Sequence, residues 1–203
     1  MTNIVLDLEW NKPLSRARKK AGLMGEIIQI GAAKIDDEGE ILDTFSVLVK
    51  PTYYYRVHKE ITELTLITTE DLQSGVPFPE AIKIFKEWCG HDFLFITWSD
   101  TDLRVLANNL DIHDLDKDWL PISLDAQLMF DDIEMQEDKN WALTYALFHF
   151  NEKPSGLHNA LSDVLSTILV LRHFDIKEAL ADEYFRYDDL INIGNDMEQF
   201  VAS

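Results

Sequence analysis

Residues 4–10 read IVLDLEW, and this stretch decides which fold the chain adopts. Its first three residues are apolar and two of them are β-branched, which predicts a buried strand that ends with Asp7 and Glu9. Side chains two positions apart on a strand point to the same face, so the two carboxylates lie side by side and Leu8 points the other way. Neighbouring carboxylates repel each other, and a divalent cation such as Mg²⁺ relieves that repulsion. The stretch therefore predicts a strand that carries a metal-binding pair of acids.

The Asp-x-Glu spacing alone is weak support for a metal site, because the chain holds 37 acidic residues. The same spacing recurs at Asp36/Glu38, Asp132/Glu134 and Asp196/Glu198. Those three pairs lie in turn-like or acidic surroundings, which is typical of a solvated surface. Only Asp7 and Glu9 directly follow an apolar strand, so the context singles them out.

Beyond this strand, the apolar pattern predicts that helices and strands alternate. A polar loop over residues 11–25 leads to strands at 26–35 and 41–49, which form a meander with the first strand. Apolar spacing then predicts helices at 79–88, 103–110, 141–148 and 157–174, a strand at 93–98, and at 122–130 a short strand that runs into a turn or a helix. This order indicates an α/β fold with a mixed central sheet flanked by helices.

Length and composition narrow the class of protein. The chain has 203 residues, of which 46% are hydrophobic, and this predicts one packed domain. It has no apolar run near the roughly 18 residues that a membrane-spanning helix needs, and its first residues lack the pattern of a signal peptide. The single cysteine, Cys89, excludes an internal disulfide framework. We therefore expect a cytoplasmic protein that does not interact with membranes.

The formal net charge of −19 is unevenly distributed, because the excess of acids lies beyond residue 60. Residues 16–20, in contrast, read RARKK and hold four basic side chains. A uniformly acidic protein repels nucleic acid, whereas a local basic segment can bind a phosphate backbone. A solvated basic loop is the alternative interpretation of the same run.

Two further groups of polar residues are candidates for chemistry. Asp100 and Asp102 come directly after the strand predicted at 93–98 and open a helix, where an acid can also be a simple N-cap. His158 precedes the most apolar helix of the chain, and Asp163 lies one turn into that helix. The same His-x4-Asp spacing occurs at His113, so a purely structural role for the pair stays open. An acid inside an apolar helix is costly unless it is exposed or bound to a partner.

Taken together and in this order, the motifs resemble the DEDDh group of DnaQ-like 3′→5′ exonucleases. The resemblance spans residues 3–174, includes EIIQIGAAKID and the block LTYALFHFNEKPSGLHNALSDV, and is similar to the stand-alone KapD-like and histone-mRNA-processing type. It implies an RNase H-like fold and two bound Mg²⁺ or Mn²⁺ ions. The implied metal ligands are Asp7, Glu9, Asp102 and Asp163, with Asp100 as the alternative to Asp102, and His158 is implied as the general base.

The implied substrate is single-stranded RNA or DNA, hydrolysed from its 3′ end to nucleoside 5′-monophosphates. Candidate substrate contacts are Leu8, Trp10, Trp98, Arg16, Arg18, Lys19 and Lys20. The tyrosines at 53–55 are further candidates for stacking on bases, although core packing is the alternative for each aromatic residue. Trp10 stands where the family often has a small residue or threonine.

The sequence is compatible with three functions. The first is a stand-alone exonuclease, the second is a proofreading-type subunit that acts within a polymerase assembly, and the third is a non-catalytic acidic domain that binds nucleic acid or protein. We expect residues 1–175 to form the exonuclease domain. Residues 176–203 are predicted to form an acidic helical tail docked on that domain, because they combine many acids with spaced apolar side chains.

Overall fold

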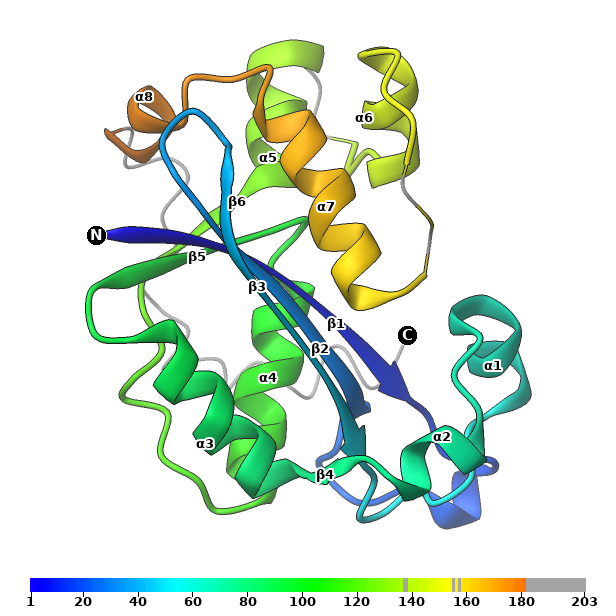
Figure 1. Ribbon diagram of the computed structural model, residues 1–203. Helices are drawn as coiled ribbons and strands as arrows, with labels where there is room; N and C mark the ends of the chain where they lie inside the picture. Colours follow the sequence, from blue (N-terminus) through cyan, green and yellow to red (C-terminus); the bar gives the residue numbers. More distant parts are fainter. Residues whose placement is uncertain (137–138, 155, 157, 182–203) are drawn as a thin grey trace.

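A computed structural model describes residues 1–136, 139–154, 156 and 158–181. The helices and strands follow the predicted order, with a six-stranded sheet at the centre (Figure 1). The strands are β1 (Thr2–Asn11), β2 (Glu26–Ile35), β3 (Ile41–Lys50), β4 (Val76–Pro77), β5 (Phe93–Thr97) and β6 (Ser123–Asp125). The helices are η1 (Arg16–Arg18), α1 (Lys59–Thr65), α2 (Thr69–Gln73), α3 (Phe78–Cys89), α4 (Thr101–Ile112), α5 (Ala126–Met129), η2 (Phe130–Met135), α6 (Leu143–His149), α7 (Ala160–Leu171) and α8 (Ile176–Ala181).

The sheet is mixed, as predicted, with the strand order β4-β3-β2-β1-β5-β6. β1, β2 and β3 pair antiparallel as a meander, whereas β5 runs parallel to β1 and β6 parallel to β5. Parallel strands have their carboxyl ends at the same edge of the sheet. The polar residues that follow β5 and β6 are therefore brought toward the carboxyl half of β1, where Asp7 and Glu9 lie.

The alternation of side chains along β1 separates the two layers of the core. Ile4, Leu6 and Leu8 pack into a cluster with apolar side chains of α3 and α4. Val5 packs on the opposite face, into a cluster that includes side chains of α7. Figure 1 shows α3 and α4 on one side of the sheet and α7 on the other. Since Asp7 and Glu9 continue the face of Val5, both acids lie on the side that α7 covers.

Three short elements, α1, α2 and β4, lie between β3 and α3, where the sequence pattern predicted no helix or strand. Helices α1 (KEITELT) and α2 (TEDLQ) hold two and one apolar residues, too few to produce an apolar periodicity. A capping box stabilises α2, in which Thr68 and Asp71 bond each other's backbone N–H groups. Residues 122–130, which were ambiguous in sequence, form β6 followed by α5.

The predicted acidic tail is described only in its first part. Ile176 and Ala179 of α8 pack into the apolar cluster that α7 shares with the sheet. The rest of the tail, residues 182–203, lies outside the described residues. None of the helices that the structure describes is both long enough and apolar enough to cross a membrane.

Helix α7 lies against the sheet at Gly31 and Gln29. A Cβ atom added to Gly31 would lie 2.4 Å from the Ala160 carbonyl carbon and from the Leu161 nitrogen. Gln29 is buried, and its side-chain oxygen accepts a hydrogen bond of 3.1 Å from the Ala160 N–H, at the first residue of α7. In the sheet, Gly31 pairs with Asp7 and Gln29 pairs with Glu9. Gly31 and Gln29, which contact the start of α7, are therefore direct neighbours of the two acids on β1.

We expect Gly31→Ala to destabilise the protein, because the added methyl group would overlap the backbone of α7. Overpacking of this kind typically costs about 1–3 kcal/mol in the free energy of unfolding. Denaturant unfolding measures the change. Ser46→Ala is the matched control, because Ser46 of β3 is exposed and pairs with Gly31 of β2. This substitution should leave the free energy of unfolding nearly unchanged. Equal stabilities of the two variants would contradict the close contact between α7 and β2.

Candidate active site

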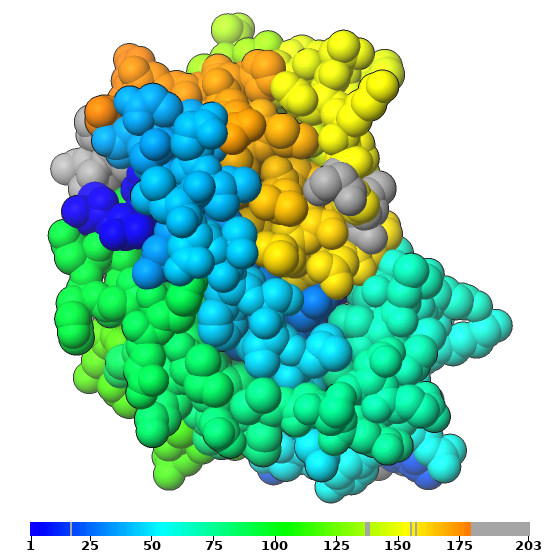
Figure 2. Space-filling model, viewed as in Figure 1, coloured from blue at the N-terminus to red at the C-terminus, as the bar shows by residue number. Residues whose placement is uncertain are grey.

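Two elements, β1 and α7, bring three acids together on one face of the sheet. Asp7 and Glu9 come from β1, and Asp163 comes from the first turn of α7. One carboxylate oxygen from each of these three residues lies within 4.8 Å of the other two. Each of the three side chains is half-buried. Figure 2 shows atoms of α7 and of the α1–α2 segment close together on this face, with atoms of the N-terminal strands visible between them.

Asp102 reaches the same region from the first turn of α4. It is 6% exposed, and its Oδ1 accepts a hydrogen bond of 2.9 Å from the backbone N–H of Leu8. Leu8 lies between Asp7 and Glu9, so this bond holds the start of α4 against the acidic part of β1. A fourth carboxylate thus joins the group from the other face of the sheet.

Asp100, the alternative to Asp102 in the sequence, is differently engaged. Its carboxylate accepts a hydrogen bond of 2.6 Å from Arg104 Nε and forms a salt bridge of 2.5 Å with the second guanidinium nitrogen. An acid paired with an arginine one turn along its own helix is already neutralised locally. The structure brings Asp102, and not Asp100, to the backbone of β1.

The acids disfavour one another's charged forms. Burial, followed by the charges of Asp163 and Asp102, raises the pKa of Glu9 from 4.5 to about 8. Burial is also the first cause that raises the pKa of Asp102 to about 7, against hydrogen bonds that lower it. The pKa of Asp7 is raised well above its ordinary value by burial and by Asp102, Glu9 and Asp163. Protons therefore remain on this cluster at a pH where ordinary carboxyl groups have lost them.

The donor set fits hard divalent cations. Within the described part of the chain, no lysine or arginine forms a salt bridge with Asp7, Glu9, Asp102 or Asp163. Carboxylate oxygens are the ligands that Mg²⁺ and Mn²⁺ prefer, and positive charge among them offsets both the cost of burying the carboxylates and their mutual repulsion. Asp7, Glu9 and Asp163 have the spacing to share an ion, and Asp102 adds a fourth carboxylate next to them.

His158 lies just before α7 and is half-buried. Its backbone N–H donates a hydrogen bond of 3.1 Å to Asp163 Oδ2, and its φ of +60° lies in the left-handed region that few non-glycine residues adopt. The charge of the imidazole and this hydrogen bond both lower the pKa of Asp163, against the larger effect of burial. A histidine held in an uncommon backbone conformation beside a cluster of acids is a candidate for a functional role.

Sequence reasoning did not single out Asp125, which lies behind the cluster at the end of β6. Its Oδ1 accepts a hydrogen bond of 3.0 Å from Leu128 and caps α5. Burial, and less strongly the charge of Asp100, raise its pKa to about 6, and its own charge contributes to the raised pKa of Asp102. The rule that parallel strands end at one edge of the sheet points to Asp125 once the strand predicted within 122–130 is known to end there.

The candidate substrate contacts fall into two groups. Leu8 is 3% exposed and belongs to the core, so it faces the acids only through its backbone. Trp10 packs against Gly25, where an added Cβ would lie 2.3 Å from the indole, and Trp98 Nε1 donates to the Trp141 carbonyl oxygen over 3.1 Å. The basic residues of the other group, Arg16, Arg18, Lys19 and Lys20, are exposed on and just after η1.

The mixed sheet, with helices on both of its sides, has the RNase H-like architecture that the resemblance in sequence implied. Residues 4–171 match the model of the RNase_T family, which is described as an exonuclease family. The chain therefore belongs to this exonuclease family.

Two proteins of Bacillus subtilis strain 168 are similar in sequence. The probable 3′-5′ exonuclease KapD is 29% identical over 108 residues, which cover 52% of this chain and 51% of KapD. The PolC-type DNA polymerase III is 28% identical over 171 residues, which cover 82% of this chain and 11% of the polymerase. The chain thus matches about half of KapD and a small part of PolC.

Solved structures share the fold at low sequence identity. The nuclease domain of 3′hExo, a DEDDh family member bound to rAMP, has a TM-score of 0.73 and 17% identity, covering 85% of this chain and 90% of that domain. Exonuclease I of E. coli in complex with a dA16 oligonucleotide has a TM-score of 0.66 and 15% identity, covering 89% of this chain and 41% of that protein. These similarities agree with the architecture derived above.

We expect the metal-free protein to lose stability as the pH rises from about 4 to 8. The folded state keeps protons on Glu9 and Asp102 up to pH values near 8 and 7, whereas the unfolded chain releases them near 4.5 and 3.8. Between these limits the folded state binds more protons, so the free energy of unfolding falls as the pH increases. Added Mg²⁺ should raise the melting temperature more at pH 8 than at pH 5, because protons then compete less for the carboxylates.

Thermal unfolding with and without Mg²⁺ across this pH range measures both effects. Glu9→Gln should weaken the pH dependence and reduce the Mg²⁺ effect. Asp132→Asn removes the same charge from an exposed acid of η2 and is the matched control. If Glu9→Gln kept the pH profile of the unmodified protein, as Asp132→Asn should, the raised pKa of Glu9 would be refuted.

Proposed function

We propose that this protein is a stand-alone, metal-dependent 3′→5′ exonuclease that hydrolyses single-stranded RNA or DNA to nucleoside 5′-monophosphates. The observation that carries the proposal is the convergence of Asp7, Glu9 and Asp163 within 4.8 Å, next to His158. Membership of the exonuclease family supports the same activity. The oligonucleotide bound to Exonuclease I and the rAMP bound to 3′hExo support a nucleic-acid substrate.

In this proposal the four carboxylates hold two Mg²⁺ or Mn²⁺ ions, with Asp7, Glu9, Asp102 and Asp163 as ligands. Two such ions, when bound, supply positive charge for the phosphoryl oxygens, promote ionisation of the attacking water and stabilise the leaving oxygen. The protein's part is to fix the ligands. The hydrogen bond from Leu8 orients Asp102, and the backbone N–H of His158 orients Asp163.

His158 is proposed as the general base. Its neutral imidazole accepts the proton of the attacking water. The N-terminal turn of α7 sets the position of both residues, because Gln29 and Gly31 fix that turn against β2. The proton acceptor and one proposed ligand therefore share one anchor on the sheet.

A proofreading-type subunit is the second candidate function. It is supported by the similarity to PolC, which extends over 82% of this chain. The non-catalytic alternative has less support, because all four acidic positions and the histidine are present together. We also propose that residues 1–175 form the catalytic domain and that the protein is cytoplasmic, which agrees with a single buried cysteine.

Digestion of an end-labelled single strand with Mg²⁺, with Mn²⁺ or with EDTA tests the proposal. A ladder that shortens from the 3′ end and requires the metal is the expected result. Parallel RNA, DNA and duplex substrates identify the preferred strand. Absence of cleavage with every metal would refute the catalytic proposal, whereas activity that appears only with a polymerase partner would favour the proofreading subunit.

We expect Asp102→Ala to abolish turnover nearly completely, since it removes a proposed ligand and the acceptor for the Leu8 N–H. Asp100→Ala should have a small effect, because Asp100 pairs with Arg104. Single-turnover rates with saturating Mg²⁺ compare the two variants, and circular dichroism checks that both are folded. An inactive Asp100 variant beside an active Asp102 variant would reverse the assignment.

We expect His158→Ala to lower the rate of the chemical step by about 10²–10⁴-fold, the usual contribution of a positioned base. The wild-type rate should fall at acidic pH, because a protonated ring cannot accept a proton, and the variant should lack this acidic limb. The Mg²⁺-induced rise in melting temperature should persist, since His158 is not a proposed ligand.

His91→Ala is the control for this experiment, because His91 is exposed in the turn before β5. Its rate and pH profile should match those of the wild type. A His158→Ala variant that kept more than about half of the wild-type rate would exclude the general-base role.

A further inference from the structure

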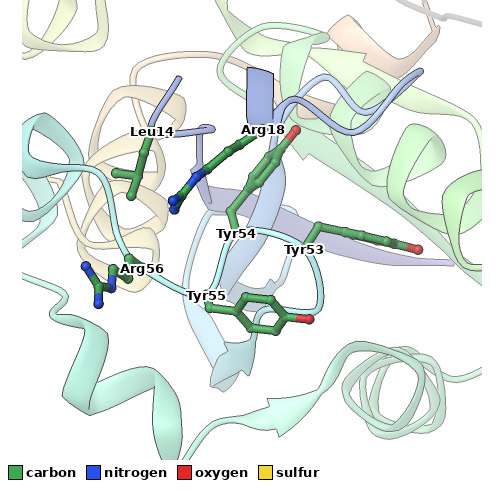
Figure 3. A pocket seen from close by; sticks show the side chains of 6 residues that line it. All are labelled: Leu14, Arg18, Tyr53, Tyr54, Tyr55 and Arg56. Atoms are coloured by element: carbon green, nitrogen blue, oxygen red, sulfur yellow. The ribbon is translucent and has the colours of Figure 1, made fainter. Parts of the chain in front are cut away.

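A pocket of about 480 Å³ lies outside the acidic cluster. It is lined by Leu14, Arg18, Tyr53, Tyr54, Tyr55 and Arg56 (Figure 3). Its walls come from two loops, one that follows β1 and one that follows β3. Its volume falls within the roughly 300–1,000 Å³ typical of pockets for small molecules. The pocket therefore has room for one nucleotide unit.

The pocket carries positive charge in a protein that is strongly acidic elsewhere. Two of its six lining residues are arginines and none is an acid. Among the described residues, no carboxylate forms a salt bridge with Arg18 or Arg56, although the chain has 37 acids for 18 bases. In Figure 3 both guanidinium groups lie on the same side of the pocket as Leu14. Such a pair is suited to a phosphate group.

The aromatic part of the pocket is held by a buried framework. Asn11, at the end of β1, is fully buried and donates hydrogen bonds to the carbonyl oxygens of Tyr54 (2.9 Å) and Arg56 (3.0 Å). The buried carboxylate of Glu26 accepts hydrogen bonds from the N–H groups of Tyr53 (2.8 Å) and Tyr54 (2.6 Å). The backbone of residues 53–56 is thus fixed from two sides.

The side chains on this fixed backbone have separate tasks. Tyr54 is buried, and its hydroxyl accepts a hydrogen bond of 3.1 Å from the Lys20 N–H, which ties the two loops together. Tyr55 is 71% exposed, and its ring lies below Leu14 and Tyr54 in Figure 3. An exposed ring on a rigid backbone offers a face on which a base can stack with little loss of conformational entropy.

We infer that this pocket binds a nucleotide unit of the substrate strand upstream of the 3′ end, with Arg18 and Arg56 at its phosphate and Tyr55 against its base. The inference rests on the proposed function, because it takes the end of that strand to lie at the acidic cluster. The two sites are linked through β1, since Glu9 precedes the pocket anchor Asn11 by two residues. A strand that leaves the cluster along the carboxyl end of β1 reaches the pocket.

The test compares substrates of increasing length, from about two to twelve nucleotides, a span that covers typical single-strand sites. The readout is the ratio of kcat/KM between the longest and the shortest strand. Arg56→Ala and Tyr55→Ala should each lower this ratio by about five- to a hundredfold, mainly through KM for the long strand. Tyr55→Phe should restore it, because stacking needs the ring and not the hydroxyl group. Lys83→Ala, at an exposed position of α3, is the control.

A second measurement locates the base. Binding of long strands with a single abasic position is measured in EDTA, so that no cleavage occurs. An abasic site at one particular position of the strand should weaken its binding to the wild-type protein but not to the Tyr55→Ala variant. The salt dependence of binding should also become shallower by about 0.7 in log–log slope for each phosphate contact that Arg18→Ala or Arg56→Ala removes.

The outcomes separate this inference from the proposed function. If the wild type cleaves no strand of any length, the proposed function fails. If the wild type cleaves but the pocket variants keep its length ratio and its abasic profile, the pocket does not bind the strand. A free nucleoside 5′-monophosphate that binds through Arg56 as tightly as a long strand does would assign the pocket to mononucleotides and overturn the inference.

Discussion

Mutual repulsion among carboxylates held in a half-buried cluster is the constraint on which the rest of this structure depends. One carboxylate oxygen from each of Asp7, Glu9 and Asp163 lies within 4.8 Å of the other two. Burial is the largest cause of the raised pKa values of these three residues. Such a cluster does not assemble by its own attraction. The surrounding fold must hold it, and the polar contacts next to the acids serve this purpose. Leu8 donates its N–H to Asp102, and Gln29 anchors α7 beside Glu9.

The sequence was sufficient to predict the elements that bury many apolar side chains. β2 has the predicted bounds of residues 26–35, and α3 extends the predicted 79–88 by one residue at each end. The elements that it did not predict are short: α1 and α2 depend on capping, and β4 consists of two residues. Apolar periodicity cannot reveal such elements, because they hold too few apolar residues to form a repeat.

The candidate site was predictable in part for similar reasons. Asp7 and Glu9 follow from the alternation along one strand, and His158 and Asp163 from their place at the start of an apolar helix. The role of Gln29, in contrast, depends on a contact between segments far apart in the chain. Gln29 lies 131 residues before the backbone group that it binds, and its own strand pattern shows only a polar residue among apolar ones. Composition and spacing contain no record of such a contact.

In the loop at residues 53–56, the main chain is bound by buried side chains, whereas the side chains of Tyr55 and Arg56 are exposed to solvent. Asn11 and Glu26 bind its main-chain atoms, so the loop keeps its shape whichever side chains it carries at its exposed positions. Tyr55 and Arg56 can therefore change during evolution with little penalty to folding, whereas Asn11 and Glu26 cannot. Homologues of this chain should diversify at these two surface positions while the two buried polar residues stay constant, and a library confined to 55 and 56 is a safe starting point for altering what the protein prefers to bind.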